Sequence, residues 1–283
     1  MNPKNDYNTR EVQTGFVESN GTWIYYEMLG HGHPLVLLHG GYMDRRMWDD
    51  QFYVLAARYH VIRYDIRGFG KSDLPQRPYA DRDDLYALLN FLGIQRTYLL
   101  GLSLGGEIAL DFTLEHPTMV DALILVGSPV SGYPHDVMFT EEQLQTLIQQ
   151  WMPFEQAVQD RSRPRMVECL MAHPTLVPSR AYPEARQRVR QYLSEYSFAW
   201  ILDPAPRQDL DPPAYGRLAE IHIPTLIITG ADDHFQLHKS ANKLAHDIAG
   251  ARRIEIPDTH HMPNMEKPTE FNQIVLDFLR TLP

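Results

Sequence analysis

The sequence has 283 residues, of which 43% are hydrophobic and 22% charged, a composition typical of a globular protein with a sizeable core. Its formal net charge of −10 disfavours binding to nucleic acid or to an anionic membrane surface. The single cysteine, Cys169, has no partner for an internal disulfide and therefore favours a reducing compartment.

The chain carries no segment typical of membrane insertion or secretion. Its longest apolar runs, at 35–38 and 122–126, are much shorter than the roughly 20 residues that a membrane-spanning helix needs. Residues 1–11 are polar and lack the apolar stretch of a secretion signal. We therefore expect a cytoplasmic protein without membrane association, in which residues 1–14 form a flexible tail.

The first half of the chain alternates between strand-like and helix-like segments. Apolar, β-branched and aromatic runs bounded by turn residues predict strands, and apolar residues recurring every three or four positions predict helices. The expected strands are 22–29, 34–39, 59–65, 97–102 and 120–126, and the expected helices are 44–58, with Asp44 as its cap, 81–92 and 104–115. Several strands are continuously apolar, which indicates burial on both faces, as in a parallel sheet covered by helices.

The pattern changes after about residue 128. Strand-like runs are absent up to about residue 220, and helices are expected at 140–151, 154–171 and 183–202. Alternation then resumes with strands at 224–229 and 253–256 and helices at 237–249 and 269–279. The simplest organisation is an α/β core formed by residues 15–128 and 221–283, with a helical insertion at 129–220.

The sequence Gly101-Leu102-Ser103-Leu104-Gly105 lies between an expected strand and an expected helix. A serine hydroxyl is a weak nucleophile unless it is exposed beside a base, and a tight strand-to-helix turn exposes it. Such a turn leaves no room for side chains two positions to either side, which explains Gly101 and Gly105. The helix start also directs free N–H groups toward developing negative charge. A turn chosen only for packing is the alternative, and the position between strand and helix favours a nucleophile.

With this motif in place, the chain resembles the α/β-hydrolase family over nearly its whole length. The resemblance implies a mostly parallel central sheet flanked by helices, with the helical insertion acting as a cap over the carboxyl edge of the sheet. His39-Gly40-Gly41 is similar to the family's oxyanion loop, so that the N–H groups of Gly41 and Leu104 are expected to hold the oxyanion. Residues 65–72, Asp-Ile-Arg-Gly-Phe-Gly-Lys-Ser, are similar to the family's D-x-R-G-x-G-x-S turn, which we interpret as structural.

The resemblance implies a catalytic histidine late in the chain, where His260 and His261 are adjacent. Glu266 follows His261 by five residues and Pro268 by seven, as in the family's pattern, and this favours His261 as the base. The family usually has a glycine just before the histidine. His260 occupies that position here, and an exchange of roles between the two histidines is the alternative.

The third member should be an acid that orients the imidazole and stabilises its protonated form. Gly230-Ala231-Asp232-Asp233 follows an expected strand, and the family's turn reads G-x-x-D, which favours Asp233 over Asp232. The family's other location for the acid, after the preceding strand, holds Gly-Ser-Pro at 127–129 and offers no carboxylate. The resulting chain order of serine, aspartate and histidine is the one expected for this fold.

Weaker signals predict little further chemistry. His234 and His238 are spaced as zinc ligands can be, but the following glutamate and a third ligand are absent, so we expect no metal. Cys169 is expected to be a packing residue. The stretch 161–190 has seven arginines, no lysine and two glutamates. It predicts a solvated surface, or alternatively one arginine that pairs with a substrate carboxylate.

Together these residues predict a serine hydrolase that cleaves a small carboxylic ester or lactone with Ser103, His261 and Asp233, without cofactor or metal. A serine at 103 disfavours haloalkane dehalogenases and epoxide hydrolases, whose nucleophile is aspartate. Carbon–carbon bond hydrolases of the meta-cleavage type use the same triad and are the alternative. A non-catalytic ligand receptor on the same fold is a further one, which a complete triad disfavours. The sequence does not indicate the oligomeric state.

Overall fold

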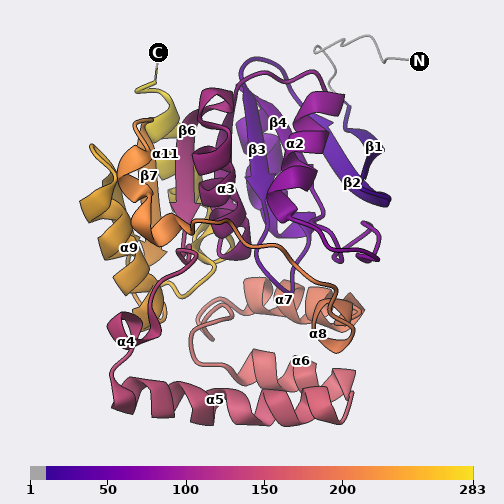
Figure 1. The fold of residues 1–283 in the computed structure, drawn as a ribbon, viewed down its shortest axis with the longest axis vertical. Coiled ribbons are helices and arrows are strands. Elements are labelled where there is room, and N and C mark those ends of the chain that lie inside the picture. The colour runs from indigo at the N-terminus through magenta and orange to yellow at the C-terminus, as the bar shows by residue number, and fades with distance from the viewer. Residues whose placement is uncertain (1–10, 283) are drawn as a thin grey trace.

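The computed structural model describes residues 11–282, and its centre is an eight-stranded sheet (Figure 1). The strand order is β1-β2-β4-β3-β5-β6-β7-β8. The strands β3 to β8 run parallel to one another, whereas β2 is antiparallel to both β1 and β4. The bounds are β1 (Gln13–Ser19), β2 (Thr22–Leu29), β3 (Pro34–Leu38), β4 (His60–Tyr64), β5 (Thr97–Leu102), β6 (Val120–Val126), β7 (Thr225–Gly230) and β8 (Arg252–Ile256). The expected mostly parallel sheet is confirmed.

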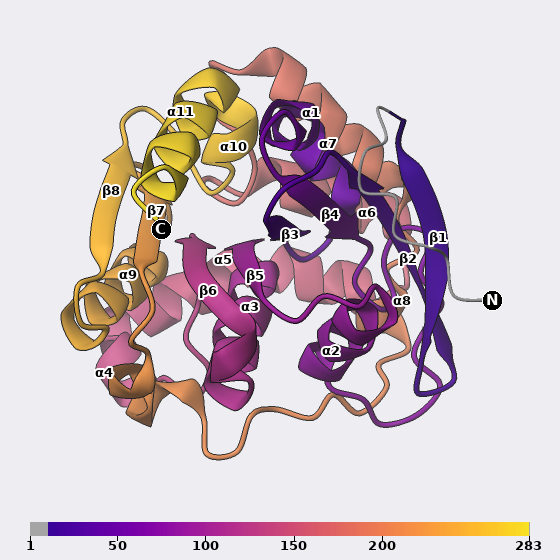
Figure 2. The ribbon, with the colours of Figure 1, turned by 90° about the horizontal axis from the view of Figure 1, so that it is seen from above.

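Helices cover both faces of the sheet. Figure 2 shows α1 (Asp49–Ala56) and α11 (Pro268–Leu279) on one face and α2 (Asp81–Phe91) and α3 (Leu104–Glu115) on the other. All residues of β4 and β5 are buried, as expected for strands that are covered on both sides. Two further helices of this core are α9 (Phe235–Asp247), which contacts β7 and β8, and the short α10 (Pro263–Glu266).

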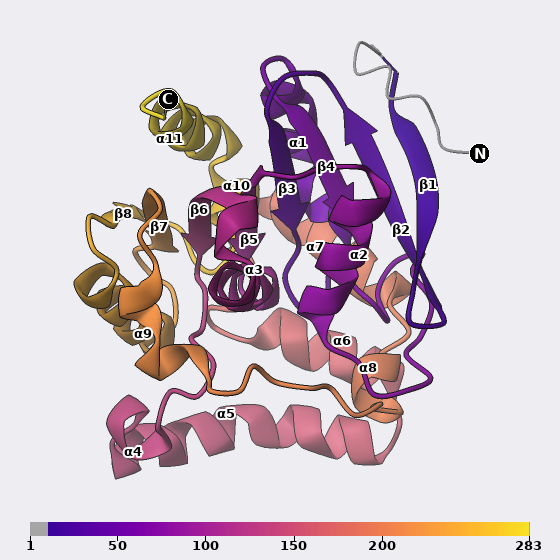
Figure 3. The ribbon, with the colours of Figure 1, turned by 45° about the horizontal axis from the view of Figure 1, so that its top comes forward.

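Between β6 and β7 the chain forms an inserted helical segment, defined here as α4 to α8. Its helices are α4 (His135–Met138), α5 (Glu141–Gln159), α6 (Arg163–Ala172), α7 (Pro183–Glu195) and α8 (Ala199–Leu202). Figures 1 and 3 show this segment as a separate layer beyond one end of the sheet, with α6 between α5 and α7. Short 3-10 turns complete the elements: η1 (Arg45–Trp48), η2 (Pro117–Met119), η3 (Ala214–Gly216) and η4 (Leu218–Glu220).

Two of the predicted helix boundaries in this segment are wrong. The expected break between 151 and 154 is absent, because α5 continues through Pro153. Its capping box at Thr140 and its buried apolar residues offset the one hydrogen bond that a proline removes. The break comes instead after Gln159, where Arg161 adopts a left-handed φ of 49° and the Ser162 N–H donates to the Ala157 carbonyl at 2.9 Å.

The helix expected at 183–202 is also interrupted. The structure ends α7 at Glu195 and starts α8 at Ala199, and Phe198 between them has a left-handed φ of 60°. Toward the start of the chain, β1 is not predicted from the sequence, because it is a largely polar edge strand in which only Val17 and Ser19 are buried. It begins at Gln13, within the expected tail 1–14, whose residues 1–10 lie outside the described residues.

The start of the first core helix follows the sequence prediction. The expected cap Asp44 accepts a hydrogen bond from the Arg46 N–H at 2.9 Å, and η1 leads directly into α1.

Among residues 11–282 no helix is both long enough and apolar enough to cross a bilayer.

Candidate functional site

Ser103 occupies the sharp turn between β5 and α3. Its backbone has φ 53° and ψ −116°, an unusual conformation for a residue other than glycine, and its N–H donates to the Val126 carbonyl at 2.8 Å. A Cβ on Gly101 would lie 2.2 Å from the Gly105 carbonyl oxygen, and a Cβ on Gly105 would lie 2.2 Å from that of Leu38. The two glycines are therefore required by the close approach of the backbone around the serine.

His261 and Asp233 form a buried pair at the carboxyl ends of neighbouring strands. Asp233 follows β7 and His261 follows β8, and His261 Nδ1 lies 3.1 Å from Asp233 Oδ2. The other oxygen of Asp233 accepts the His234 N–H at 2.7 Å, and the two side chains of the pair are only 4% and 1% exposed. Because a carboxylate can only accept here, the imidazole carries its proton on Nδ1 and leaves Nε2 free.

The pair shifts the pKa of the histidine. Burial lowers the pKa of His261, but the charge and hydrogen bond of Asp233, with a smaller contribution from Glu266, outweigh burial, so that the pKa is raised above its usual 6.5. A raised pKa makes the imidazole a better proton acceptor while its protonated form stays stabilised by the carboxylate.

Gly127, at the end of β6, lies against this pair. It has a left-handed φ of 49°, and a Cβ there would lie 2.9 Å from His261 Nδ1 and 3.1 Å from Asp233 Oδ2. Sequence reasoning missed this role, since it considered 127–129 only as a place for an acid. The signal available in the sequence was a glycine directly after the expected strand of β6. The strands on either side of β6 in the sheet are β5 and β7, which are followed by Ser103 and Asp233.

The two alternative residues, His260 and Asp232, take no part in this pair. The ring of His260 is directed to the Val177 carbonyl, 3.2 Å from its Nδ1, and the backbone N–H of His260 donates to the Glu266 carboxylate. Asp232 is exposed, and among residues 11–282 the interaction shown for it is that of its backbone N–H with the Thr259 carbonyl. The structure thus brings His261 and Asp233 together and leaves His260 and Asp232 apart from that pair.

Ser103 and His261 line the same small cavity, of about 50 Å³, which is room for little more than one or two water molecules. Most of its wall is apolar and comes from both the core and the inserted helical segment. The lining residues include Gly40, Gly41, Leu102, Leu170, Leu176 and Leu193. The inserted segment therefore forms part of the wall around the serine.

The two expected oxyanion donors flank the serine. Leu104 is the first residue of α3, so its N–H has no partner within the helix. Gly41 lines the cavity, and a Cβ added to it would meet no atom within 4 Å, which shows open space beside it. A Cβ added to the adjacent Gly40 would lie 3.6 Å from the Ser103 Cβ, so this loop passes close to the serine.

His39 and the turn at 65–72 support that loop. His39 is fully buried, its Nε2 accepts the Ile66 N–H at 2.9 Å, and its Nδ1 lies 2.8 Å from the Gly40 carbonyl. Burial lowers the pKa of His39, in keeping with the neutral ring that this arrangement needs. The Asp65 carboxylate binds Arg45 and the Lys71 N–H, and neither Asp65 nor Arg67 lines the cavity of Ser103.

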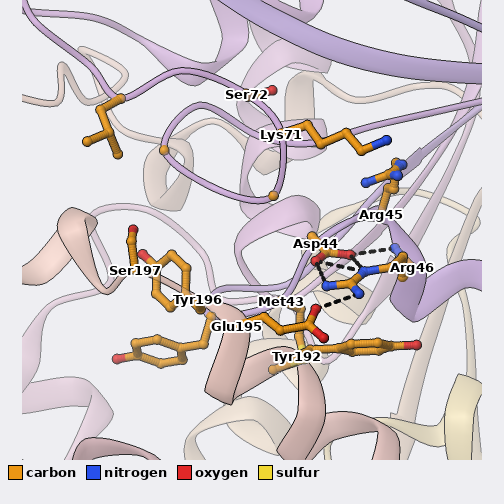
Figure 4. Close-up of a pocket in the computed structure, with 14 residues that line it drawn as sticks. Met43, Asp44, Arg45, Arg46, Lys71, Ser72, Tyr192, Glu195, Tyr196 and Ser197 are labelled. Atoms are coloured by element: carbon orange, nitrogen blue, oxygen red, sulfur yellow. Dashed lines mark hydrogen bonds and ion pairs between the residues drawn. The ribbon is translucent and has the colours of Figure 1, made fainter. Parts of the chain in front are cut away.

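A larger cleft of about 510 Å³ adjoins the cavity and shares Tyr42 and Met43 with it. Figure 4 shows its charged side chains, of which Arg46 is bound to both Asp44 and Glu195. Tyr42 has a left-handed φ of 63° and contacts the rings of Phe154, Tyr196, Phe198 and Trp200. Tyr42 thus packs into a cluster of aromatic rings from the inserted segment.

The arginines of 161–190 do not reach the serine. None of the seven lines its cavity, and those with described partners bind carboxylates or carbonyls of the segment itself or, for Arg188, Asp50 of the core. The hypothesis that one of them pairs with a substrate carboxylate at this cavity gains no support.

His234 caps α9, His238 lies near Glu255, and residues 11–282 contain no cluster of three potential metal ligands.

Comparisons with known proteins identify the family of this chain. A model of the alpha/beta hydrolase fold family matches residues 33–268. A 2-hydroxy-6-oxo-6-phenylhexa-2,4-dienoate hydrolase from Comamonas testosteroni is 29% identical over 269 residues, covering 91% of both chains. The expected α/β-hydrolase fold is therefore confirmed.

Solved structures of esterases and lactone-degrading enzymes also resemble the chain. An esterase from Exiguobacterium antarcticum is 26% identical with a TM-score of 0.77, over 95% of this chain and all (100%) of that one. Est816, described as an N-acyl homoserine lactone degrading enzyme, is 27% identical with a TM-score of 0.70, over 93% of this chain and 100% of its own. Proteins described as a dienoate hydrolase, an esterase and a lactone-degrading enzyme thus resemble this chain.

Proposed function

The chain belongs to the alpha/beta-hydrolase family, and on that premise we propose that it is a serine hydrolase that cleaves a small carboxylic ester or lactone through an acyl-enzyme. The observation that carries the proposal is the shared cavity of Ser103 and His261, with the imidazole hydrogen-bonded to Asp233 on its far nitrogen. A receptor would not need a hydroxyl and a poised base in one cavity.

In the proposed acylation step the Ser103 hydroxyl attacks the substrate carbonyl and passes its proton to His261 Nε2. Asp233 holds the imidazole by its Nδ1–H and stabilises the imidazolium. The negative charge on the carbonyl oxygen is held by the N–H groups of Gly41 and Leu104. When the tetrahedral intermediate collapses, the carbon–oxygen bond breaks and His261 donates the proton to the leaving alkoxide.

Deacylation repeats these steps with water. His261 removes a proton from the water, the oxygen attacks the acyl carbon, and the intermediate collapses to release the acid and regenerate the Ser103 hydroxyl. For a lactone the leaving alcohol is part of the acyl group, so a single hydroxy acid is the product. The scheme uses only side chains and backbone of this chain, without cofactor or metal.

In this proposal the inserted helical segment, within 129–220, is a cap on a core formed by 15–128 and 221–283. Leu170, Leu176 and Leu193 form an apolar wall opposite the serine, which suits an apolar group of a small-molecule substrate. The cavity of about 50 Å³ is smaller than such a substrate. Binding therefore requires the cap or the Tyr42 ring to move outward.

Carbon–carbon bond hydrolysis is the second candidate, favoured by the relative from Comamonas testosteroni at 29% identity. The same serine and histidine would serve a vinylogous 1,5-diketone acid, but the bond broken would be carbon–carbon. The proton then goes to a carbon atom of the leaving group rather than to an oxygen.

A substrate panel separates the two. Purified protein and the Ser103→Ala variant are assayed with esters of increasing acyl length, with γ- and δ-lactones, and with a 2-hydroxy-6-oxo-dienoate. We expect turnover of a short ester or lactone that is lost in Ser103→Ala. Turnover of the dienoate alone would favour the second candidate, and no serine-dependent turnover of any class would refute both.

A further inference from the structure

Two segments far apart in the sequence are hydrogen-bonded beside the candidate site. One is the histidine loop, residues 257–262, and the other is a strap of the inserted helical segment, residues 175–179 between α6 and α7. The His261 N–H donates to the Thr175 carbonyl at 3.1 Å, and His260 Nδ1 lies 3.2 Å from the Val177 carbonyl. The backbone of the loop that carries His261 is thus hydrogen-bonded to the strap.

Glu266, in α10, connects the same two segments through its side chain. One carboxylate oxygen accepts the Ser179 N–H of the strap at 2.8 Å, and the other accepts the His260 N–H of the histidine loop at 2.8 Å. The residue is only 5% exposed. Hydrogen bonds to a buried carboxylate are stronger than neutral ones, and each N–H would lose its shown partner if the carboxylate were removed.

The strap is also part of the wall of the Ser103 cavity. Leu176 and Val177 line that cavity together with His261 and Met262. Glu266 itself does not line the cavity, and it faces a cleft of about 610 Å³ on the outer side, between α7 and the core. Its carboxylate therefore acts on the site only through the backbone that it holds.

We propose that Glu266 is a positioning residue of this site: by binding the N–H groups of both His260 and Ser179, it fixes the histidine loop against the strap. This proposal rests on the proposed function, which gives His261 the role of base. The consequence is that the position of His261 depends on the hydrogen bonds that join the histidine loop to the strap. Displacing a base by a fraction of an ångström slows the chemical step far more than it weakens substrate binding.

Glu266→Gln tests the proposal with little change of shape. An amide has one acceptor oxygen, and its NH₂ group cannot accept the second N–H, so one of the two bonds is lost. We expect kcat to fall by about 10-fold or more, with KM within about threefold, because the apolar wall stays in place. The rate of inactivation of Ser103 by a serine-directed phosphonate should fall by the same factor, expressed per active site titrated at the end point.

The matched control is Arg188→Gln. Arg188 in α7 forms an ion pair with Asp50 in α1 at 2.5 Å, so it also links the inserted segment to the core, and it lines the same outer cleft as Glu266. It does not contact the histidine loop. We expect its kcat and its inactivation rate to stay within about twofold of wild type.

The outcomes are distinct. A Glu266→Gln protein that reacts at the wild-type rate per titrated site, or an Arg188→Gln protein that slows equally, overturns the positioning role. If Glu266→Gln does not fold, Ser179→Pro removes the N–H at the strap end of the bridge and must slow the phosphonate reaction for the proposal to stand. A wild-type protein that the phosphonate does not label refutes the proposed function itself, whereas a labelled wild type with an equally reactive Glu266→Gln refutes only the inference.

Discussion

Replacing Gly127 by alanine should lower both the unfolding free energy and kcat/KM, and a control variant separates the two effects. The new Cβ would lie 2.9 Å from His261 Nδ1 and 3.1 Å from Asp233 Oδ2, on a residue with a φ of 49°. Contacts this short force the pair to shift by a few tenths of an ångström, and small displacements of a base cost large factors in rate. We expect kcat/KM to fall by about 10- to 100-fold.

The same variant should lose about 1–2 kcal/mol of unfolding free energy, because alanine is strained in the left-handed region. Gly250→Ala is the matched control, since Gly250 has a φ of 75° and an added Cβ would meet nothing within 4 Å. It should lose a similar unfolding free energy while keeping wild-type kcat/KM. Urea unfolding and ester hydrolysis measure the two quantities. Wild-type activity in Gly127→Ala, or an equal loss in Gly250→Ala, would refute the reasoning.

Three further predictions concern the serine, the histidine and a buried carboxyl group. Ser103→Ala should lower kcat by a factor on the order of 10⁴ to 10⁶ while leaving the urea midpoint nearly unchanged, which is checked by circular dichroism beside the activity assay. The base must be neutral, so kcat/KM should fall as pH drops through the raised pKa of His261, with a midpoint above 6.5 that moves to lower pH in Asp233→Asn. An unshifted midpoint in that variant would contradict the pairing. Burial raises the pKa of Asp111 to about 7 even though the Ser131 hydroxyl donates to it, so the folded state holds a proton that the unfolded state releases near pH 4. The unfolding free energy should therefore decrease as pH rises from about 4 to about 7, and Asp111→Asn should flatten that dependence in urea titrations.

The parts of the fold that follow local rules could be predicted from the sequence. Continuously apolar strands indicated a buried parallel sheet, and the glycines around Ser103 indicated the turn that the structure has. Asp233 and His261 could be singled out through the resemblance to the family's patterns, a G-x-x-D turn for the acid and a downstream glutamate and proline for the histidine. Each also follows a strand, and parallel strands bring their carboxyl ends to one edge. Asp233 and His261 come within 3.1 Å of each other because the strands that precede them are neighbours in the sheet.

The features that depend on distant contacts could not be predicted. A proline within α5 is tolerated because the helix is capped and packed elsewhere, which a local proline rule does not include. Gly127 is constrained by side chains that lie more than a hundred residues later in the chain. Glu266 entered the sequence argument only as a marker of the histidine pattern, and its bonds to Ser179 and His260 become visible only when the strap and the loop are seen together.

Activation of the Ser103 hydroxyl by the buried His261–Asp233 pair is measured by peptide mapping after phosphonate treatment. We expect a stoichiometric adduct on the peptide that contains Ser103 in the wild-type protein, and a strongly slowed adduct in a folded His261→Ala variant. An adduct on another residue, or labelling of Ser103 at the same rate without His261, would contradict it.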